Sequence, residues 1–491
     1  MYKMRSWTLN AYDRWRLGET EPVRLRENRP ADEPSENLLQ AIWQHQRLRR
    51  DDLRTLDGQR VRVLHPGFHN REAGPDFRGA VLQFEDAPSC SGDIEVDVHS
   101  GLWRAHGHEA NPAYEKVRLH VVWRGTDQIP TRPPTLALHS FLDAPLEQLE
   151  QWLTTEPAQT APRAALDGHC HPCLRQAPVE TVHGILHQSA QVRLRAKAAQ
   201  FEARARQSGW EQALWEGLFR ALGYKQNVWP MHRLAEMLPE IGRLNAGQPS
   251  AIPAWQARWL GLSGLLPADL SRSNLHTDHY LSQIWSLWWR ERDALQHLIL
   301  PRTTWRFNNL RPANHPCRRL ALAAHWLAAG NLPARLEAWF ATDASSARLQ
   351  ASLMEILQPK PDPYWSTHYT LRSRNQDHTQ PLLGVARATD LALNAILPWF
   401  QARIQAGHDS DAPSRAEAYY FTWPKAEDNS KLRLARQRLF GGARWRWLRG
   451  GAEQQGVLQI AHDYCDQSNA ICSQCRFPEF IRRGATAAEK G

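Results

Sequence analysis

Residues 92–99 read Gly92-Asp93-Ile94-Glu95-Val96-Asp97-Val98-His99, a stretch in which acidic and apolar side chains alternate. Successive side chains of a β-strand point to opposite faces, so the alternation predicts a strand that is apolar on one face. Three carboxylates and one imidazole then crowd together on the other face. Neighbouring carboxylates repel one another and raise one another's pKa unless a cation lies among them, and Mg²⁺ prefers carboxylate oxygens. The stretch therefore predicts a metal site on the polar face of a sheet.

The sequence around this stretch predicts the rest of an α+β core. Apolar residues recur at helical spacing over residues 35–50, and residues 111–116 are a short helical candidate. Strands are expected over residues 61–65, 77–84, 93–99 and 117–123. From residue 179 onward the apolar residues recur at every third and fourth position, which predicts helices. We therefore expect an N-terminal α-β-β-β-α-β core followed by a mainly helical region.

The acidic stretch and the segment Gly74-Pro75-Asp76-Phe77 together resemble the active-site motif of the PD-(D/E)xK nuclease superfamily. The α-β-β-β-α-β core of that superfamily carries an Asp on its second strand and (D/E)-x-K on its third. Pro75-Asp76 matches the first half of the motif, and Asp97-Val98-His99 matches the second half with His in place of Lys. The missing Lys departs from the pattern and leaves open an inactive, nuclease-like domain.

We expect Asp76, Glu95 and Asp97 to bind Mg²⁺ or Mn²⁺, with His99 as a base or a phosphate contact. Such ions lower the pKa of a bound water and neutralise charge on a phosphodiester, and a neutral His can accept a proton. The alternative interpretation is a half-buried strand with a solvated polar face after a Gly-Pro-Asp turn. Downstream, His106-Gly107-His108 indicates either a loop that lines the same site or exposed histidines in a turn.

Size and composition indicate a globular protein with several domains. The chain has 491 residues, of which 42% are hydrophobic and 23% are charged. No apolar run approaches the roughly 18 residues that cross a bilayer, and the N-terminus lacks the apolar region of a secretory signal. We therefore expect no membrane segment and a cytoplasmic location. The formal net charge of +9 fits a polyanionic partner such as nucleic acid, although a GC-rich genome gives the same Arg-rich composition.

The composition changes after Gly125, first to a proline-rich segment and then to a linker-like segment over residues 155–168. We therefore expect four parts in the chain. They are a nuclease-like core over residues 1–155, a linker with a C-x2-C motif over 156–178, a mainly helical region over 179–455 and a cysteine-rich tail over 456–491.

Five of the seven cysteines fall into two clusters, one in the linker and one in the tail: Cys170, Cys173, Cys465, Cys472 and Cys475. The first cluster is C-x2-C and the second is C-x6-C-x2-C. Two such clusters can close one tetrahedral metal site, which would hold the tail against the linker. Thiolates suit both Zn²⁺ and an iron-sulfur cluster, and the alternative is free cytosolic thiols.

A segment of the helical region that is dense in Arg, Asn and Pro predicts contacts with phosphate. Arg306, Arg311 and Arg318 are the side chains expected to bind nucleic acid, because guanidinium groups pair with phosphate oxygens. A packed loop between helices explains the segment equally well. The leading hypothesis is a metal-dependent phosphodiesterase, a hydrolase that acts on DNA or RNA. The alternative is a non-catalytic nucleic-acid-binding or scaffold protein with a structural Zn²⁺ or iron-sulfur site.

Six segments spread along the chain together resemble an uncharacterised bacterial family, domain of unknown function 2851. They are Gly74-Pro75-Asp76-Phe77, Gly92–His99 with Trp103 and His106–His108, Ala113–Val122, Ala221–Asn227, Trp305-Arg306 with Arg311–Asn314, and Tyr464–Cys475. The likeness spans nearly the whole chain. It implies a cytoplasmic bacterial protein and no established activity, so the hypotheses on function rest on the residues themselves.

Overall fold

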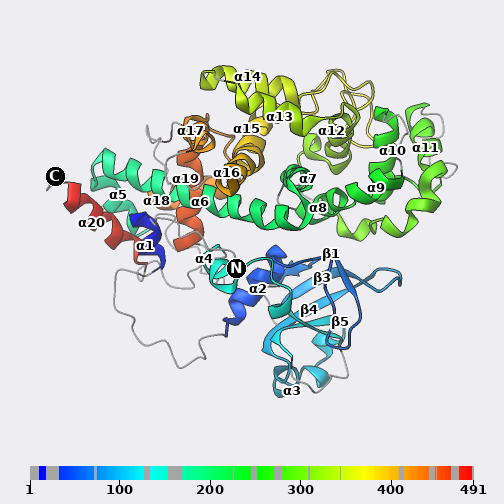
Figure 1. The fold of residues 1–491 in the computed structure, drawn as a ribbon, viewed down its shortest axis with the longest axis horizontal. Coiled ribbons are helices and arrows are strands. Elements are labelled where there is room, and N and C mark those ends of the chain that lie inside the picture. Colours follow the sequence, from blue (N-terminus) through cyan, green and yellow to red (C-terminus); the bar gives the residue numbers. More distant parts are fainter. Residues whose placement is uncertain are drawn as a thin grey trace. The chain divides into compact units, whose positions relative to one another are not determined.

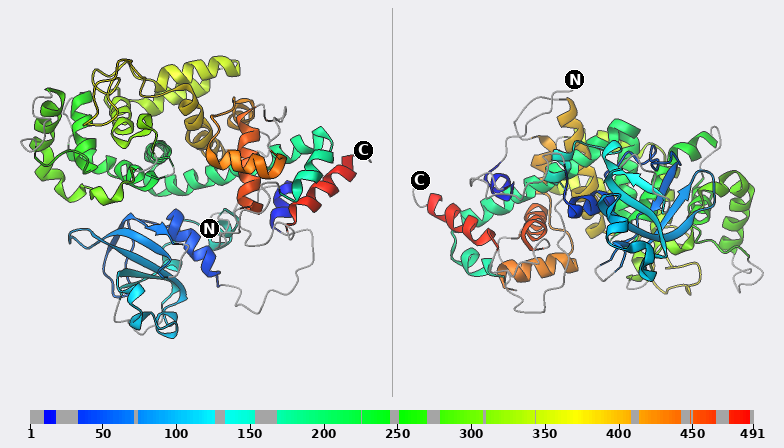
Figure 2. Two further views of the ribbon diagram at one scale, coloured as in Figure 1. Left: turned by 180° about the vertical axis from the view of Figure 1, so that it is seen from behind. Right: turned by 90° about the horizontal axis from the view of Figure 1, so that it is seen from below.

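The computed structural model of the chain describes residues 10–17, 33–70, 74–125, 133–152, 168–224, 226–244, 251–269, 279–307, 310–342, 344–407, 414–441, 448, 450–465 and 475–488. Contacts between residues divide the chain into two compact units. Unit 1 comprises residues 1–203 and 397–491, and unit 2 comprises residues 204–396. Figure 1 and Figure 2 show the ribbon, in which unit 2 runs from green to yellow.

The N-terminal part of unit 1 is built on a six-stranded mixed sheet, blue to cyan in Figure 1. Its strands are β1 (Val61–His65), β2 (Phe68–His69), β3 (Phe77–Phe84), β4 (Cys90–His99), β5 (Val117–Arg124) and β6 (Thr135–Ala137). They lie in the order β1-β3-β4-β5-β6, with β2 paired to β3. Antiparallel pairs join β1, β2 and β4 to β3, whereas β5 is parallel to β4 and β6 is parallel to β5. The connection from β4 to β5 is therefore a crossover from one end of the sheet to the other.

Helix α2 (Glu36–His45) is the helix predicted to precede the strands, and it ends earlier than expected. It begins at Ser35, whose Oγ accepts a hydrogen bond from the Leu38 N–H. It ends because Gln46 adopts a left-handed backbone with φ of 49°, from which the helix cannot continue.

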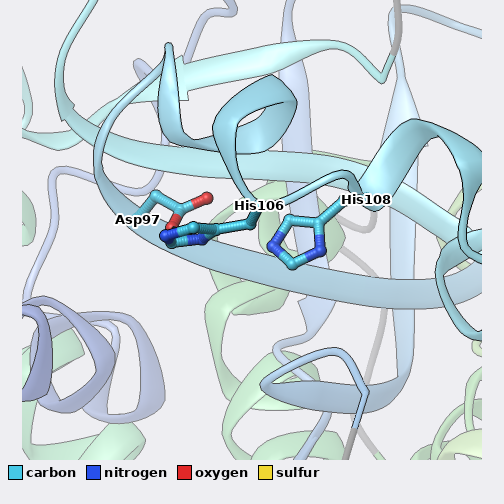
Figure 3. Close-up of side chains that lie close together, drawn as sticks. All are labelled: Asp97, His106 and His108. Atoms are coloured by element: carbon cyan, nitrogen blue, oxygen red, sulfur yellow. The ribbon is translucent and has the colours of Figure 1, made fainter.

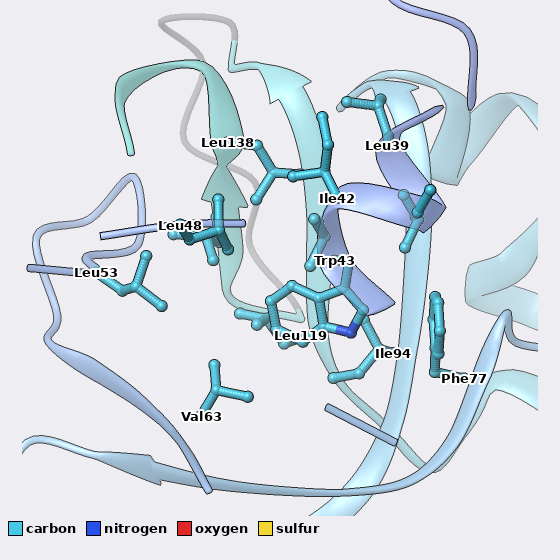
Figure 4. Close-up of a cluster of buried hydrophobic side chains, with 14 of the residues drawn as sticks. Leu39, Ile42, Trp43, Leu48, Leu53, Val63, Phe77, Ile94, Leu119 and Leu138 are labelled. Atoms are coloured by element: carbon cyan, nitrogen blue, oxygen red, sulfur yellow. The ribbon is translucent and has the colours of Figure 1, made fainter. Parts of the chain in front are cut away.

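The hydrophobic core of this part lies between α2 and the sheet (Figure 4). Trp43 of α2 is fully buried, and its Nε1–H donates to the carbonyl oxygen of Pro66 at 2.9 Å. Ile94 and Val96 of β4 belong to the same buried cluster. The predicted alternation of β4 is therefore confirmed, because its apolar residues face the core and its acidic residues face away from it.

Strand β1 ends at the predicted Pro66-Gly67 turn. Gly67 has φ of +94°, and a Cβ atom built on it would lie 2.9 Å from Cβ of Phe77. Both the backbone angle and the close approach therefore require glycine at this position.

The helix predicted over residues 111–116 is instead a single 3₁₀ turn over Pro112–Tyr114, which the Asn111 side chain caps. The crossover also contains α3 (Leu102–Ala105), a helix of four residues. Segments this short close too few hydrogen bonds to sustain a regular helix, so sequence spacing alone does not predict them.

In the rest of the described chain, the regular elements are helices joined by loops. Unit 1 contains α1 (Ala11–Leu17), α4 (Leu146–Trp152), α5 (Cys170–Gln176), α6 (Val179–Ser208), which continues into unit 2, α16 (Leu397–Gly407), α17 (Arg415–Thr422), α18 (Ser430–Phe440), α19 (Gly451–Ile460) and α20 (Phe477–Ala488). Unit 2 contains α7 (Trp210–Leu222), α8 (Val228–Glu236), α9 (Leu238–Leu244), α10 (Ile252–Leu262), α11 (His279–Leu295), α12 (Pro316–Ala328), α13 (Leu332–Ala341), α14 (Ser346–Leu357) and α15 (Val385–Leu391). The expected order, an N-terminal sheet with short helices followed by a mainly helical region, is confirmed. None of the helices in the described ranges has both the length and the apolar character needed to span a bilayer.

Candidate metal centre

Asp76, which immediately precedes β3, lies beside Glu95 of β4. The register pairs Phe77 of β3 with Ile94 of β4, which places the residue before Phe77 next to the residue after Ile94. The Asp76 N–H donates to Oε2 of Glu95 at 3.2 Å, and the Val96 N–H donates to Oδ2 of Asp76 at 2.9 Å. The backbones of two strands thus hold both carboxylates in place.

Asp97 lies on the same face of β4 as Glu95 and is buried. Its Oδ2 accepts a hydrogen bond from Nε2 of His120 on β5 at 2.9 Å. A carboxylate can only accept, so Nε2 of His120 carries the proton in this contact. His120 is itself buried, and the bond fixes the orientation of the Asp97 carboxylate.

The crossover between β4 and β5 brings two histidines to these carboxylates. One ligand atom from each of Asp97, His106 and His108 lies within 4.8 Å of the other two (Figure 3). Nδ1 of His106 is 3.7 Å from Oδ1 of Asp97, and Nε2 of His108 is 3.3 Å from Oε1 of Glu95. Gly107, between the two histidines, has φ of +70°, a backbone angle that favours glycine. The turn at Gly107 lets both rings face β4.

Aromatic rings enclose His108. Its ring stacks on Tyr114 with centroids 3.9 Å apart, and it meets Trp103 in an edge-on contact at 5.3 Å. The same three side chains line a cavity of about 980 Å³, whose wall also includes Asn111 and Arg118. Cavities of this volume are typical of ligand-binding sites. The cavity therefore gives a ligand room beside His108, whose Nε2 is 3.3 Å from Oε1 of Glu95.

The carboxylates of this site lack a Lys or Arg partner in the part of the chain that the structure describes. Among the residues that the structure describes, no Lys or Arg forms an ion pair with Asp76, Glu95 or Asp97. Burial, together with the charges of neighbouring carboxylates, raises the pKa of Asp76 to about 7 and the pKa of Glu95 to about 9. Ionising both acids is therefore unfavourable without a cation, and a divalent ion would supply the missing positive charge.

The family model for a protein of unknown function, DUF2851, matches residues 36–430. The chain belongs to the DUF2851 family. No curated protein and no solved structure matches it. The span matched by DUF2851 includes the three carboxylates and the two crossover histidines, and it ends before Cys465.

His99, the predicted base, lies at the end of β4 in this DUF2851 chain. Its Nε2 is 2.7 Å from Oε1 of Glu33, and its side chain is 55% exposed. The close ligand atoms around Asp97 come from His106 and His108 and not from His99. The sequence indicated that the His106-Gly107-His108 segment could be a loop that lines this site, but His106 and His108 were not among the predicted site residues. The signal was two histidines flanking a glycine just after the acidic strand.

The three arginines predicted to bind nucleic acid differ in exposure. Arg306 and Arg311 are exposed in unit 2, whereas Arg318 is only 1% exposed. The Arg318 guanidinium donates to four backbone carbonyl oxygens, those of Trp365, His368, Gln380 and Pro381. These bonds join α12 to the segment after α14, so the structure gives Arg318 a structural use in place of the expected phosphate contact.

Cysteines from both predicted clusters meet one hydrophobic cluster in unit 1. Cys170 belongs to its buried core, and Cys173, Cys465 and Cys475 pack against that core. Residues of the linker and of the tail are therefore close together. Within the described ranges, no three cysteines bring their ligand atoms close enough to form a metal-binding group, and Cys472 lies outside those ranges.

Proposed function

We propose that this DUF2851 chain is a metal-dependent phosphodiesterase, a nuclease that hydrolyses DNA or RNA. One observation carries the proposal: Asp76 and Glu95 are joined by a hydrogen bond, Asp97 follows on the same face of β4, and none of the three has a Lys or Arg ion pair in the described part of the chain. A Mg²⁺ or Mn²⁺ ion supplies the missing positive charge, since both prefer oxygen ligands. Bound there, the ion would lower the pKa of a water and neutralise charge on a phosphodiester.

The residues around the proposed ion have separate roles. Asp76 and Glu95 would hold the ion, and Asp97 would add a third carboxylate. The Gln40 side chain of α2 donates to Oδ1 of Asp76 at 2.9 Å and so keeps this carboxylate oriented. His99, half exposed at the end of β4, is the proposed base or phosphate contact, because a neutral imidazole can accept a proton from water.

The proposal also draws on the likeness of Pro75-Asp76 and the acidic stretch to the motif of PD-(D/E)xK nucleases. A helix, α2, precedes three antiparallel strands, β1, β3 and β4, and a crossover then leads to β5 parallel to β4. Asp76 stands before the second of these strands and Glu95 on the third. The register places Glu95, rather than Asp97, beside Asp76. The position two residues after Glu95 holds Asp97, and the position two after Asp97 holds His99, so neither offers the Lys of the motif.

The charge of the chain supports a polyanionic substrate. The formal net charge is +9 at pH 7, which favours association with phosphate backbones. Arg306 and Arg311 are exposed side chains of unit 2 and are the proposed contacts with nucleic acid. Guanidinium groups pair with phosphate oxygens in two-pronged geometry.

The test of the proposed function measures cleavage by the full chain. Labelled single- and double-stranded DNA and RNA are incubated with the protein in Mg²⁺ or in Mn²⁺. Wild type is expected to cleave at least one substrate. Asp76→Ala is expected to cleave that substrate at least about 100-fold more slowly, because the ion loses a ligand.

The matched control is Asp93→Asn, which changes an acidic residue of the same strand outside the group. Asp93 accepts a hydrogen bond from the Gly79 N–H at 2.9 Å, and its variant is expected to keep wild-type cleavage. Cleavage that survives in Asp76→Ala contradicts the proposal. Binding with a steep salt dependence and no cleavage by wild type favours the non-catalytic alternative.

A second metal, Zn²⁺ or an iron-sulfur cluster, is proposed at the cysteines. The proposal rests on one shared hydrophobic cluster. Cys170 belongs to it, and Cys173, Cys465 and Cys475 pack against it. Metal content by mass spectrometry and the visible spectrum of the purified protein test it. Absorption near roughly 400 nm indicates an iron-sulfur cluster, and Zn²⁺ that is lost in Cys173→Ser, without that absorption, indicates a zinc site at the cysteines. A metal content that is unchanged in Cys173→Ser would contradict both.

A further inference from the structure

We infer that Asp97, His106 and His108 form an ion position of their own, which takes a borderline divalent metal such as Zn²⁺. This position lies beside the Asp76 and Glu95 carboxylates. The inference deepens the proposed function, because it assigns ligands and a metal class within the same site. Its test measures metal binding alone, so its outcome does not depend on finding a nucleic-acid substrate.

Distances among the ligand atoms carry the first step. One ligand atom from each of Asp97, His106 and His108 lies within 4.8 Å of the other two. An ion bonded at about 2.0 to 2.3 Å to each ligand spans ligand atoms up to about 4.6 Å apart, which is close to this limit. Oδ1 of Asp97 and Nδ1 of His106 are 3.7 Å apart, which is close to the spacing of two ligands on one ion. Two imidazoles and one carboxylate leave further positions on the ion for water or substrate.

The His108 ring carries the second step. His108 is 8% exposed, and neither of its ring nitrogens has a hydrogen-bond partner in the described structure. Nε2 lies 3.3 Å from Oε1 of Glu95 without forming a hydrogen bond. A buried imidazole without hydrogen bonds is unfavourable, because its polar atoms have lost water. The ring is also held in place, stacked on Tyr114 and edge-on to Trp103. A metal ion would give one of these buried nitrogens a partner without moving the ring.

His120 carries the third step of the argument, because it orients the ligand Asp97 by a hydrogen bond to one carboxylate oxygen. Nε2 of His120 donates to Oδ2 of Asp97 at 2.9 Å, which leaves Oδ1 of the carboxylate on the side of His106. Ligating carboxylates in metal sites are themselves hydrogen-bonded in this way, and the bond fixes the ligand geometry. His120 is buried, so water does not compete for this bond.

The ligand types decide the metal class. Imidazole suits Zn²⁺, Fe²⁺, Cu²⁺ and Ni²⁺, whereas Mg²⁺ and Mn²⁺ prefer oxygen ligands. The Asp76 and Glu95 pair offers only oxygens, and the Asp97 group offers two nitrogens and an oxygen. We therefore expect Zn²⁺ to be held by the Asp97 group in preference to Mg²⁺.

A second group of similar composition in unit 2 shows what a compensated cluster is like. Glu216, His232 and Glu236 also place ligand atoms within 4.8 Å of one another. There, however, Arg204 donates to both oxygens of Glu216 at 2.7 and 2.9 Å, and Arg233 lies 3.1 Å from Glu236. Guanidinium groups already balance these carboxylates, so this group carries no metal proposal. The Asp97 group has no such arginine among the described residues.

The experiment measures Zn²⁺ binding by the full, metal-free chain. Equilibrium dialysis followed by mass spectrometry gives the ions bound per chain, and competition with a chelator gives the affinity. His106→Ala and His108→Ala are each expected to bind about one ion fewer than wild type, while the cysteines are unchanged. His120→Gln is expected to lower the affinity for this ion about 10- to 100-fold, because Asp97 loses the hydrogen bond that orients it. His139→Ala, which removes an exposed histidine of the same part, is the control and is expected to bind like wild type.

The His106 variant keeps the test decisive if burial makes the His108 variant unstable. The His106 side chain is 48% exposed, so its removal is expected to leave the circular dichroism spectrum unchanged. Zn²⁺ binding by His106→Ala with wild-type stoichiometry and affinity overturns the inference, as does a wild-type chain that binds Mg²⁺ at this position more tightly than Zn²⁺.

The outcomes also separate this inference from the proposed function. Zn²⁺ bound through His106 and His108 without any nucleic-acid cleavage upholds the ion position and contradicts the nuclease. Cleavage that depends on Asp76, together with His106→Ala and His108→Ala variants that bind Zn²⁺ like wild type, upholds the nuclease and contradicts the ion position.

Discussion

Asp76 and Glu95 are joined by a hydrogen bond from the Asp76 N–H to Oε2 of Glu95 at 3.2 Å. The Val96 N–H donates in turn to Oδ2 of Asp76 at 2.9 Å. Because both bonds involve the backbone of paired strands, the two carboxylates cannot move apart without disturbing the sheet. Their repulsion is relieved by a proton or by a cation, and the predictions below depend on which of the two is present.

Glu95→Gln is expected to remove part of the pH dependence of stability in the metal-free protein. The pKa of Glu95 is raised to about 9 in the folded chain, so between about pH 5 and 9 the folded state keeps a proton that the unfolded state has released. Stability then falls as pH rises through this range. As pH rises, the unfolding free energy of Glu95→Gln should increase relative to that of wild type, by up to about 1 kcal/mol per pH unit.

The Glu95→Gln measurement is thermal or urea unfolding in the presence of a chelator. The variant amide can still accept from the Asp76 N–H, and it can donate to Nε2 of His108, which is 3.3 Å from Oε1. Glu109→Gln, an exposed carboxylate of the same crossover, is the control. A gap that stays constant with pH would show that Glu95 titrates normally.

Added Mn²⁺ is expected to stabilise wild type more at high pH than at low pH. Metal ligands must be deprotonated, and the raised pKa values of Asp76 (about 7) and Glu95 (about 9) make protons compete with the ion. An ion that binds only the folded state raises the melting temperature. The shift caused by Mn²⁺ should therefore be larger near pH 8 than near pH 5.5, and equal shifts at both would contradict metal binding at these acids.

Gly107→Ala is expected to destabilise the crossover and to weaken metal binding. Gly107 has φ of +70°, and a side chain there costs about 1 to 2 kcal/mol of backbone strain. No atom lies within 4 Å of a Cβ built on it, so strain is the only expected effect. Gly101→Ala is the matched control, since Gly101 has a helical backbone with φ of −69° and equal space. Equal urea midpoints for the two variants would contradict this account.

Trp43→Phe is expected to lower the unfolding free energy by about 1 to 3 kcal/mol. The substitution leaves a void between α2 and the sheet and removes the donor to the Pro66 carbonyl, which stays buried (Figure 4). Urea unfolding followed by far-ultraviolet circular dichroism measures the change. Trp289→Phe, at a tryptophan that is 38% exposed, is the control, and a similar effect in both would contradict the role of Trp43.

Local patterns predicted the sheet and its acidic face. The alternation over residues 93–99 has a period of two, which is the period of a strand. The Gly-Pro-Asp turn placed Asp76 directly before the strand predicted over residues 77–84. The pairing of Asp76 with Glu95 follows from the register of β3 and β4. Register depends on the turn between the strands, which the sequence pattern does not specify.

The sequence did not predict the positions of His106, His108 and Arg318, because those positions depend on long-range packing. His106 and His108 reach Asp97 only because the crossover to β5 folds back over the strand. Arg318 has the same local sequence signal as Arg306 and Arg311, and only tertiary contacts with distant carbonyl groups distinguish it. Such contacts leave no periodic signal in the sequence.

The most direct test of the central claim counts the protons released when a divalent ion binds. Calorimetric titration of the metal-free chain with Mn²⁺ is performed at about pH 6.5 in two buffers of different ionisation enthalpy. With Asp76 and Glu95 mostly protonated at that pH, the account predicts release of about one to two protons per ion. Glu95→Gln should release about one fewer. Mn²⁺ that binds without releasing protons, or that does not bind, would contradict the claim that an ion lets these acids share one site.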